Sequence, residues 1–164
     1  MNFSIITAMD ISNNIGISNK LPWNLPNEMK WFRKNTVNKP CIMGSSTFKS
    51  IKKPLPERLN IILTRDKFIN CGKCLVFSSL EELLDFDLLK KYPELMVIGG
   101  ENIYNQFLPL INKIYLTTIY DNFEGDKKFP LIDFKEWNQI DSSEHFENNT
   151  FYRTSIFKRI NNER

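Results

Sequence analysis

Metal-binding residues are scarce in this chain of 164 residues, which has three cysteines and one histidine. A structural zinc site needs four ligands, and His145 lies far along the chain from the closely spaced pair Cys71 and Cys74. We therefore expect no metal site. A redox-active C-x-x-C usually begins a helix after a strand. This pair instead precedes the apolar run 75–77, as a turn into a strand would, so a metal or redox role is the less favoured alternative.

Long apolar runs and strong charge are missing as well. No run approaches the roughly 20 residues that a membrane span needs, and a net charge of +3 gives no strong sign of nucleic-acid binding. We expect neither membrane nor nucleic-acid partners. Free thiols are expected at the cysteines, and no N-terminal signal sequence is present. Both features indicate the cytoplasm.

Repeats, linkers and low-complexity segments are absent too, and the length fits one domain spanning residues 1–164. Apolar runs predict strands at 3–9, 40–44, 59–63, 74–77, 95–98, 114–120, 137–143 and 151–160. Helical periodicity predicts helices at 26–36 and 101–108 and two that begin near 45 and 79. Strands that alternate with helices, followed by strands alone, indicate an α/β fold with a mostly parallel central sheet and an antiparallel C-terminal edge hairpin.

A polar segment at 10–20 is predicted to be a long loop. Long loops inside compact domains are often lids or binding loops. A plain connection between two elements is an equally open interpretation of this segment. The sequence alone does not decide between the two.

Glu28 is the one acidic residue of the predicted helix 26–36, and it lies beside an apolar stripe that includes Met29 and Phe32. Pro26 suits the first helical position, where its missing N–H costs nothing. A carboxyl group in apolar surroundings has a raised pKa and can hold a proton near neutral pH. Glu28 is therefore a candidate catalytic acid. The alternative is a glutamate at the helix edge that reaches water.

Three short segments that suit phosphate groups follow predicted strands, at 44–47, 64–65 and 99–100. The first reads Gly-Ser-Ser-Thr at a helix start, where free N–H groups and the helix dipole attract anions. The third is a pair of glycines, which lets a backbone approach a pyrophosphate closely. Ligands of parallel sheets bind beyond the carboxyl ends of the strands. Together the segments predict a site for a dinucleotide.

The chain resembles the dihydrofolate reductase family in the order and spacing of motifs over nearly its whole length. The motifs are Pro-Trp-Asn-Leu-Pro at 22–26, Ile-Met-Gly at 42–44, Pro-Leu-Pro-Glu-Arg at 54–58, Val-Ile-Gly-Gly at 97–100 with Tyr104, Leu-Thr at 116–117 and Glu-Gly-Asp at 124–126. The resemblance implies a three-layer fold with helices on both faces of the sheet. It also implies a monomer that reduces dihydrofolate to tetrahydrofolate with NADPH, in the service of one-carbon metabolism.

The same resemblance implies roles in catalysis and substrate binding. Glu28 matches the acid that bonds the pterin ring and promotes protonation of N5 while a hydride reaches C6. Thr117 matches the residue bonded to that acid, Trp23 matches a residue that holds a water nearby, and Leu21 lies in what resembles the mobile loop over the nicotinamide. Arg58 matches the arginine that pairs with the α-carboxylate of the substrate's glutamate, a role that suits its fixed fork. The matched pocket-lining positions are Ile6, Ala8, Glu28, Met29, Phe32, Ile51, Leu55, Ile98 and Thr117.

Contacts to NADPH are implied for a larger set of residues. The family also makes the peptide between Gly99 and Gly100 cis, which is rare away from proline. The implied cofactor-binding residues are Ala8, Ile15, Gly16, Gly44, Ser45, Ser46, Thr47, Leu63, Thr64, Arg65, Ile98, Gly99, Gly100, Glu101, Asn102, Ile103, Tyr104 and Gln106.

Three positions depart from the family pattern. Many bacterial members have Asp in place of Glu28, but other members have Glu, so activity is not in doubt. Ser45 stands where many members have a basic residue beside the adenosine phosphate, so we expect the preference for NADPH over NADH to rest mostly on Arg65. Glu101 begins the helix after the two glycines. Because a carboxylate repels a pyrophosphate, we expect Glu101 to point outward.

Two other functions remain open on the sequence alone. One is a related NADPH-dependent reductase that acts on a pyrimidine of the flavin pathway, and the other is a nucleotide-binding module without catalysis. The pair Glu28 and Arg58 favours dihydrofolate, because a pterin with a glutamate tail needs both an acid and a cation.

Overall fold

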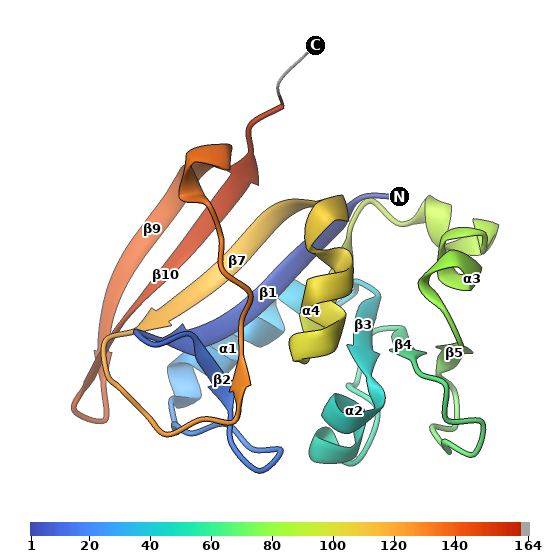
Figure 1. Cartoon of the computed structure of the whole chain (residues 1–164), viewed down its shortest axis with the longest axis horizontal. Helices are drawn as coiled ribbons and strands as arrows, with labels where there is room; N and C mark the ends of the chain where they lie inside the picture. The colour runs from blue at the N-terminus through green and yellow to red at the C-terminus, as the bar shows by residue number, and fades with distance from the viewer. Residues whose placement is uncertain (162–164) are drawn as a thin grey trace.

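An eight-stranded sheet forms the centre of the molecule (Figure 1). The computed structural model describes residues 1–161, and residues 162–164 lie outside the described part. The strands of this sheet are β1 (Phe3–Asp10), β3 (Cys41–Gly44), β4 (Asn60–Leu63), β5 (Leu75–Phe77), β6 (Leu95–Gly99), β7 (Ile111–Ile119), β9 (Trp137–Glu147) and β10 (Thr150–Arg159).

The strand order is β5-β4-β3-β6-β1-β7-β10-β9. β10 is antiparallel to both of its neighbours, β7 and β9, and the other pairs are parallel. The predicted parallel sheet with an antiparallel C-terminal edge hairpin is therefore confirmed. Its last two strands are joined by the short turn at 148–149, where both asparagines have positive φ angles.

Helices cover both faces of this sheet, as expected. They are α1 (Pro26–Thr36), α2 (Ser45–Ile51), α3 (Leu80–Leu84) and α4 (Glu101–Phe107), with short 3-10 turns η1 (Asp87–Lys91), η2 (Leu108–Leu110) and η3 (Phe134–Glu136). Successive strand residues point to opposite faces. In β1, Ile5 packs into the core cluster that includes Phe107 of α4, while Ile6 packs into the cluster that includes Phe48 of α2 and Trp31 of α1. In Figure 1, α4 lies in front of the sheet and α1 behind it.

A second, very small sheet lies in segments where the sequence predicted no strand. β2 (Asn14–Gly16) pairs with β8 (Lys127–Lys128) inside what was expected to be irregular chain. Strands of two and three residues are too short to show a hydrophobic alternation, so no local pattern could predict them. Their pairing ties the loop after β1 to the loop after β7.

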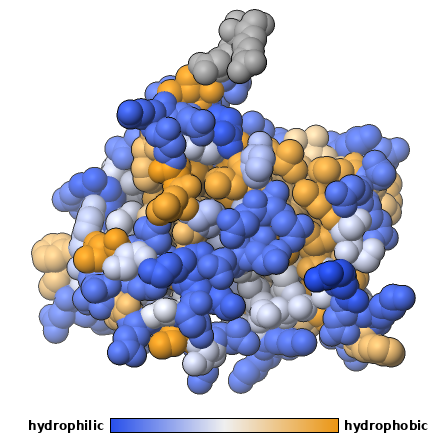
Figure 2. Space-filling view, in the orientation of Figure 1, coloured by the Kyte–Doolittle hydropathy of each residue, from blue (hydrophilic) through white to orange (hydrophobic). Residues whose placement is uncertain are grey.

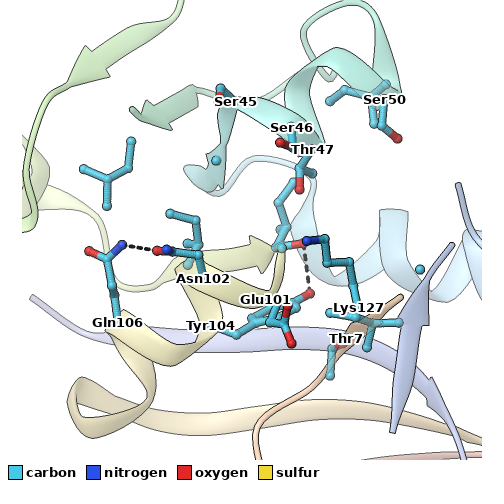
Figure 3. A pocket seen from close by; sticks show the side chains of 18 of the residues that line it. Thr7, Ser45, Ser46, Thr47, Ser50, Glu101, Asn102, Tyr104, Gln106 and Lys127 are labelled. Carbon is cyan, nitrogen blue, oxygen red and sulfur yellow. Dashed lines mark hydrogen bonds between the residues drawn. The ribbon is translucent and has the colours of Figure 1, made fainter. Parts of the chain in front are cut away.

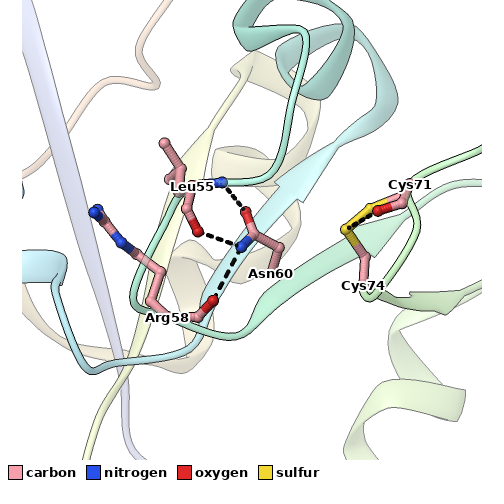
Figure 4. Close-up of a disulfide and its surroundings, with 5 residues drawn as sticks. All are labelled: Leu55, Arg58, Asn60, Cys71 and Cys74. Carbon is pink, nitrogen blue, oxygen red and sulfur yellow. Dashed lines mark hydrogen bonds between the residues drawn. A yellow bond between two sulfur atoms is a disulfide. The ribbon is translucent and has the colours of Figure 1, made fainter.

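A disulfide joins Cys71 and Cys74 (Figure 4), so the expectation of three free thiols is wrong. Gly72 has a positive φ of 66° and turns the chain back, which leaves the two Cα atoms 5.6 Å apart, a usual separation for a disulfide. Cys41 is free and buried. The pair precedes β5, as predicted.

The carboxyl ends of β1, β3 and β7 point toward the lower side of the view in Figure 1. Figure 2 shows that the lower half of this face is mostly hydrophilic, whereas hydrophobic residues gather in its upper half. Among the described helices, none is both long enough and apolar enough to cross a membrane.

Candidate active site

A cavity of about 1070 Å³ opens where β1, β3, β4 and β6 end. This is the edge at which open α/β sheets bind their ligands. Cavities for one small ligand usually measure about 300–1,000 Å³. The volume of this one lies at the upper end of that range.

Glu28 lies in the cavity wall, in the first turn of α1. Pro26 occupies the helix start, as predicted, and this places Glu28 on the face of α1 turned to the sheet. The side chain is 5% exposed, and Thr117 Oγ1 donates a hydrogen bond of 3.0 Å to Glu28 Oε1. Burial raises the pKa of Glu28 to about 6, against the lowering effect of the Thr117 hydrogen bond and with a further raising effect of the Glu147 charge. The side chain therefore holds a proton more readily than an exposed glutamate.

The surroundings of Glu28 are apolar. Five of the expected pocket residues belong to one packed cluster on the α1 and α2 face of the sheet, namely Ile6, Phe32, Ile51, Leu55 and Ile98. The structure places every expected apolar residue in the cavity wall: Ile6, Ala8, Leu21, Met29, Phe32, Ile51, Leu55 and Ile98.

Thr117 and Trp23 lie behind the wall rather than in it. Thr117 is fully buried in β7 and reaches the site through its bond to Glu28. Trp23 packs edge-on against Phe123, with ring centroids 5.7 Å apart. Its indole N–H is buried and has no hydrogen-bond partner within residues 1–161. That donor matches the water-holding role implied by the resemblance.

Arg58 also lies outside the cavity wall, in the same turn as Leu55 (Figure 4). Its Nε donates to Pro56 O at 2.7 Å, and its Nη1 donates to Thr36 Oγ1 at 2.8 Å. Asn60 is 4% exposed and closes this turn by accepting from Leu55 N–H at 2.8 Å and donating to the carbonyls of Leu55 and Arg58. The guanidinium is thus fixed at the rim, beyond the apolar end of the cavity. Asn60 is a supporting residue that the sequence analysis missed.

The starts of α2 and α4 face each other across another part of the cavity (Figure 3). Gly44 and Gly100 are the N-cap residues and contribute no capping side chain. A Cβ at Gly100 would lie 3.5 Å from Thr47 Oγ1, and a Cβ at Gly44 would lie 3.0 Å from the Ile103 side chain. The Gly99–Gly100 peptide is cis, as expected. Two sets of helix N–H groups therefore meet at one place.

Nearly all the residues expected to bind the cofactor line the cavity. Gly99 is the exception, because it lies against the ring of Tyr104, where a Cβ would approach within 3.0 Å. Tyr104 Oη lies 2.9 Å from the carbonyl oxygens of Ile6 and Ile98, which fixes α4 to β1 and β6. The lining members are Ala8, Ile15, Gly16, Gly44, Ser45, Ser46, Thr47, Leu63, Thr64, Arg65, Ile98, Gly100, Glu101, Asn102, Ile103, Tyr104 and Gln106.

Glu101 does not point away from the cavity, so that expectation is wrong. It lines the wall, and its Oε1 accepts a hydrogen bond of 3.2 Å from the backbone N–H of Lys128. Lys127, next to that contact, also lines the cavity (Figure 3). The β8 strand therefore places a cation in the same wall as Glu101, and a positive charge there offsets part of the repulsion between Glu101 and a phosphate.

Ten lining residues were not predicted. Most of them belong to segments that reach the cavity through the fold, such as the start of α3 and the strand β8, and no local motif marks them. They are Thr7, Asn19, Lys20, Ser50, Ser78, Ser79, Leu80, Glu81, Asn105 and Lys127.

Asp10 anchors the loop that carries Ile15, Gly16 and Leu21 into the cavity wall. The Asp10 carboxylate is fully buried and accepts four hydrogen bonds of 2.8 to 2.9 Å, from the backbone N–H groups of Ser12, Asn14 and Phe123 and from Asn14 Nδ2. Burial alone would raise the pKa of Asp10, but these hydrogen bonds outweigh it and lower the pKa. Asp10 thus holds the loop after β1 against the loop after β7.

Comparisons with known proteins agree with this site. The dihydrofolate reductase family model matches residues 2–160. The dihydrofolate reductase of Haemophilus influenzae is 43% identical over 137 residues, which cover 84% of each chain, and that of Buchnera aphidicola subsp. Baizongia pistaciae is 42% identical over 98% of this chain and 99% of its own. The dihydrofolate reductase from Enterococcus faecalis, solved with NADP(H) and RAB-propyl, superimposes with a TM-score of 0.88 at 31% identity, over 98% of this chain and 97% of the other. By sequence and by fold, the chain belongs to the dihydrofolate reductase family.

Proposed function

We propose a division of roles for the reaction of this chain, the NADPH-dependent reduction of 7,8-dihydrofolate to 5,6,7,8-tetrahydrofolate. Glu28 bonds the pterin ring and promotes protonation of N5, and the apolar wall around it receives the ring. The observation that carries this proposal is a carboxyl group that is 5% exposed, bonded to Thr117 and pressed into an apolar cavity.

The reaction needs an acid because a C=N bond accepts a hydride more easily once its nitrogen is protonated. NADPH, when bound, supplies the hydride. Glu28 supplies the proton-holding group, since a pKa of about 6 leaves roughly a tenth of it protonated at pH 7, far more than an exposed glutamate would keep. Thr117 fixes the orientation of the carboxyl group, and Trp23 presents its buried N–H beside the lid. Leu21, which is half exposed, supplies the apolar cover from the lid loop.

The wall formed by α2, α4 and the ends of β4 and β5 has the donor set that a dinucleotide with several phosphates requires. Backbone N–H groups at both helix starts and the hydroxyls of Ser45, Ser46 and Thr47 face the cavity. Arg65 lines the same wall, and its neighbour Asp66 pairs with Lys49 at 3.8 Å rather than with Arg65 among the described residues. We assign the 2′-phosphate of NADPH to Arg65, because a guanidinium has the fork that suits phosphate.

The experiment that tests the role of Glu28 is Glu28→Gln, which keeps the shape of the side chain and removes the acid. We expect single-turnover hydride transfer to fall by about 10²–10⁴ at neutral pH, with NADPH affinity unchanged. The loss should shrink at low pH, where the substrate is protonated by solvent. Glu144→Gln is the matched control, since Glu144 lies on the exposed edge strand and pairs with Arg153 at 2.7 Å. Wild-type rates in Glu28→Gln at neutral pH would disprove the assignment.

The whole chain is proposed to be one catalytic domain that acts as a monomer in the cytoplasm. The support for a monomer is that a single chain lines the cavity with both the Glu28 site and the helix starts of α2 and α4. Because disulfides are rare in that compartment, the Cys71–Cys74 bond makes the location testable. If the protein resides there, alkylation before lysis should trap both cysteines as thiols, whereas an intact disulfide would contradict the proposed location.

A further inference from the structure

Glu147, at the end of β9, caps the helix that carries Glu28. Both of its carboxylate oxygens accept from the backbone N–H of Asn27, at 2.9 and 3.1 Å. Leu25 occupies the N-cap position of α1 and has no side-chain acceptor. The acceptor that α1 lacks in its own sequence therefore comes from the β9–β10 hairpin, about 120 residues away.

Two carboxyl groups thus share one helix start. Asn27 immediately precedes Glu28, so the group bonded to Asn27 N–H lies beside the acid of the cavity. Like charges disfavour the state in which both are ionised. Glu147 is partly exposed and accepts three hydrogen bonds, from Asn27 twice and from the hydroxyl of Tyr152 at 3.2 Å. Glu28 is deeply buried and accepts one. Of the two, Glu28 is therefore the carboxyl group whose protonated form burial favours.

We propose that Glu147 is a positioning residue for catalysis: by capping α1 as a carboxylate next to Glu28, it increases the fraction of the acid that holds a proton. The inference rests on the proposed role of Glu28. It adds a residue from the C-terminal hairpin that touches neither substrate nor cofactor and lies outside the cavity wall.

The other groups around the pair are neutral at pH 7 or reach water. Thr117 of β7 bonds Glu28 and does not titrate in this range. Burial raises the pKa of Tyr104, on α4, and raises that of Tyr152, on β10, to about 12, so both phenols stay neutral. His145 of β9 stacks on Tyr152 with ring centroids 4.8 Å apart and bonds Thr154 through Nε2. Lys20 of the lid loop lines the same cavity but is exposed.

The test separates the charge of Glu147 from its capping bond. Glu147→Gln keeps an oxygen acceptor for Asn27 N–H and removes the charge, whereas Glu147→Asp keeps the charge. The carboxyl titration of Glu28 is followed by ¹³C NMR of protein labelled at the glutamate side-chain carboxyl, with the signal assigned by its loss in Glu28→Gln. The pH profile of single-turnover hydride transfer is measured on the same variants, and Glu144→Gln is the control on the same strand.

We expect Glu147→Gln to lower the pKa of Glu28 by about half a pH unit, the effect of one charge in solvent-rich surroundings. The hydride-transfer profile should move to lower pH by the same amount. Glu147→Asp and Glu144→Gln should keep the wild-type values. In the unaltered protein, about 1 M KCl should lower the pKa of Glu28 too, because the Debye length falls to about 3 Å. If Glu147 only capped the helix, Glu147→Gln would change neither the pKa of Glu28 nor the dependence of that pKa on salt.

An unchanged Glu28 titration in Glu147→Gln would overturn the inference, as would a wild-type titration that is insensitive to salt. Both readouts are independent of turnover. Full activity of Glu28→Gln would instead disprove the proposed acid and leave the measured coupling between the two carboxyl groups standing. The salt titration needs no variant, so the inference stays testable if Glu147→Gln folds poorly.

Discussion

The carboxyl group of Glu28 is 5% exposed, and burial raises its pKa to about 6 from a usual 4.5. The folded chain therefore binds more protons than the unfolded chain between these two values, and the free energy of unfolding falls as the pH rises through them. A shift of this size corresponds to about 2 kcal/mol. Glu28→Gln has no such titration, so its free energy of unfolding should not fall over this range. The difference in free energy of unfolding between Glu28→Gln and wild type should therefore be up to about 2 kcal/mol larger, in favour of the variant, at about pH 8 than at about pH 4. Urea unfolding at both pH values measures the difference.

The control for this stability effect is Glu144→Gln, in which an exposed carboxylate is replaced. It should change stability by the same small amount at both pH values. If Glu28→Gln showed the same difference from wild type at both, the carboxyl group would not be held in its protonated form by the fold.

Arg58 lies at the cavity rim, where bonds to Pro56 O and Thr36 Oγ1 fix it. A charge-assisted pair with the substrate's glutamate tail contributes about 1.5–3 kcal/mol, so Arg58→Leu should raise KM for dihydrofolate roughly ten- to a hundredfold. NADPH affinity should stay unchanged. Arg33→Leu is the matched control, since Arg33 is exposed and pairs with Glu57 at 2.7 Å. Steady-state kinetics with dihydrofolate and with a pterin that lacks glutamate decide the matter, because an equal rise in both KM values would rule out a role in tail binding.

Arg65 is proposed to bind the 2′-phosphate of NADPH, because Ser45, in the same cavity wall, carries no charge. Losing one charged contact costs about 1.5–3 kcal/mol. We therefore expect Arg65→Ala to reduce the NADPH-to-NADH preference by roughly ten- to a hundredfold, and Ser45→Arg to increase it. Lys67→Ala, two residues further along the same loop, is the control and should leave the ratio as it is. A collapse of the ratio in that variant, and not in Arg65→Ala, would move the role to Lys67.

At the scale of elements, the loop after β1 depends on Asp10, which accepts four hydrogen bonds without exposure to water. Asp10→Asn replaces one acceptor oxygen with an NH₂ group that faces N–H donors. The buried donors left unpaired should cost about 1–3 kcal/mol of stability. NADPH affinity should also fall, because Ile15 and Gly16 line the cavity from this loop. Faster amide exchange across 11–17 would report the loosened lid. Ser12→Ala is the control, since that hydroxyl bonds Asn122 at the surface.

Helices and strands with a periodic pattern of apolar residues were predictable from the sequence. The short strands that form only by pairing with a distant segment were not. The helix 26–36 is α1 to the residue, because Pro26 starts it and an apolar face continues it. The helix expected to begin near 79 is α3, which Ser79 caps by accepting from Glu82 N–H, while the Glu82 carboxylate accepts from Ser78 N–H. β2 and β8 exist through their contact with each other, and the disulfide depends on a turn at Gly72. The strand pair leaves no local signal, and the Cys71–Cys74 spacing predicts a turn but not whether the two thiols are joined.

At the scale of the whole molecule, site residues were predictable where the same short segment contains both the residue and the neighbours that position it. Glu28 and the glycines at 99–100 belong to such motifs, and their positions followed from the rule that ligands bind beyond strand ends. Lys127 and Glu147 reach the site from distant segments whose placement depends on the complete sheet. Glu101 was misplaced for the same reason, because its partner at 128 comes from β8.

Ligand binding should appear in the stability of the whole fold, because the cavity wall joins β1, both loops and four helices. NADPH at 100 times its Kd should stabilise the chain by about 2.7 kcal/mol. For a domain of this size that is a rise in Tm of roughly 5–10 °C. NADH at the same concentration should give only about 0.4–1.4 kcal/mol, if it binds ten- to a hundredfold more weakly. In Arg65→Ala the increase in Tm caused by NADPH should fall to that caused by NADH. Thermal unfolding with each cofactor measures both increases without turnover. If the gap between NADPH and NADH persisted in that variant, the 2′-phosphate would be bound elsewhere on the wall.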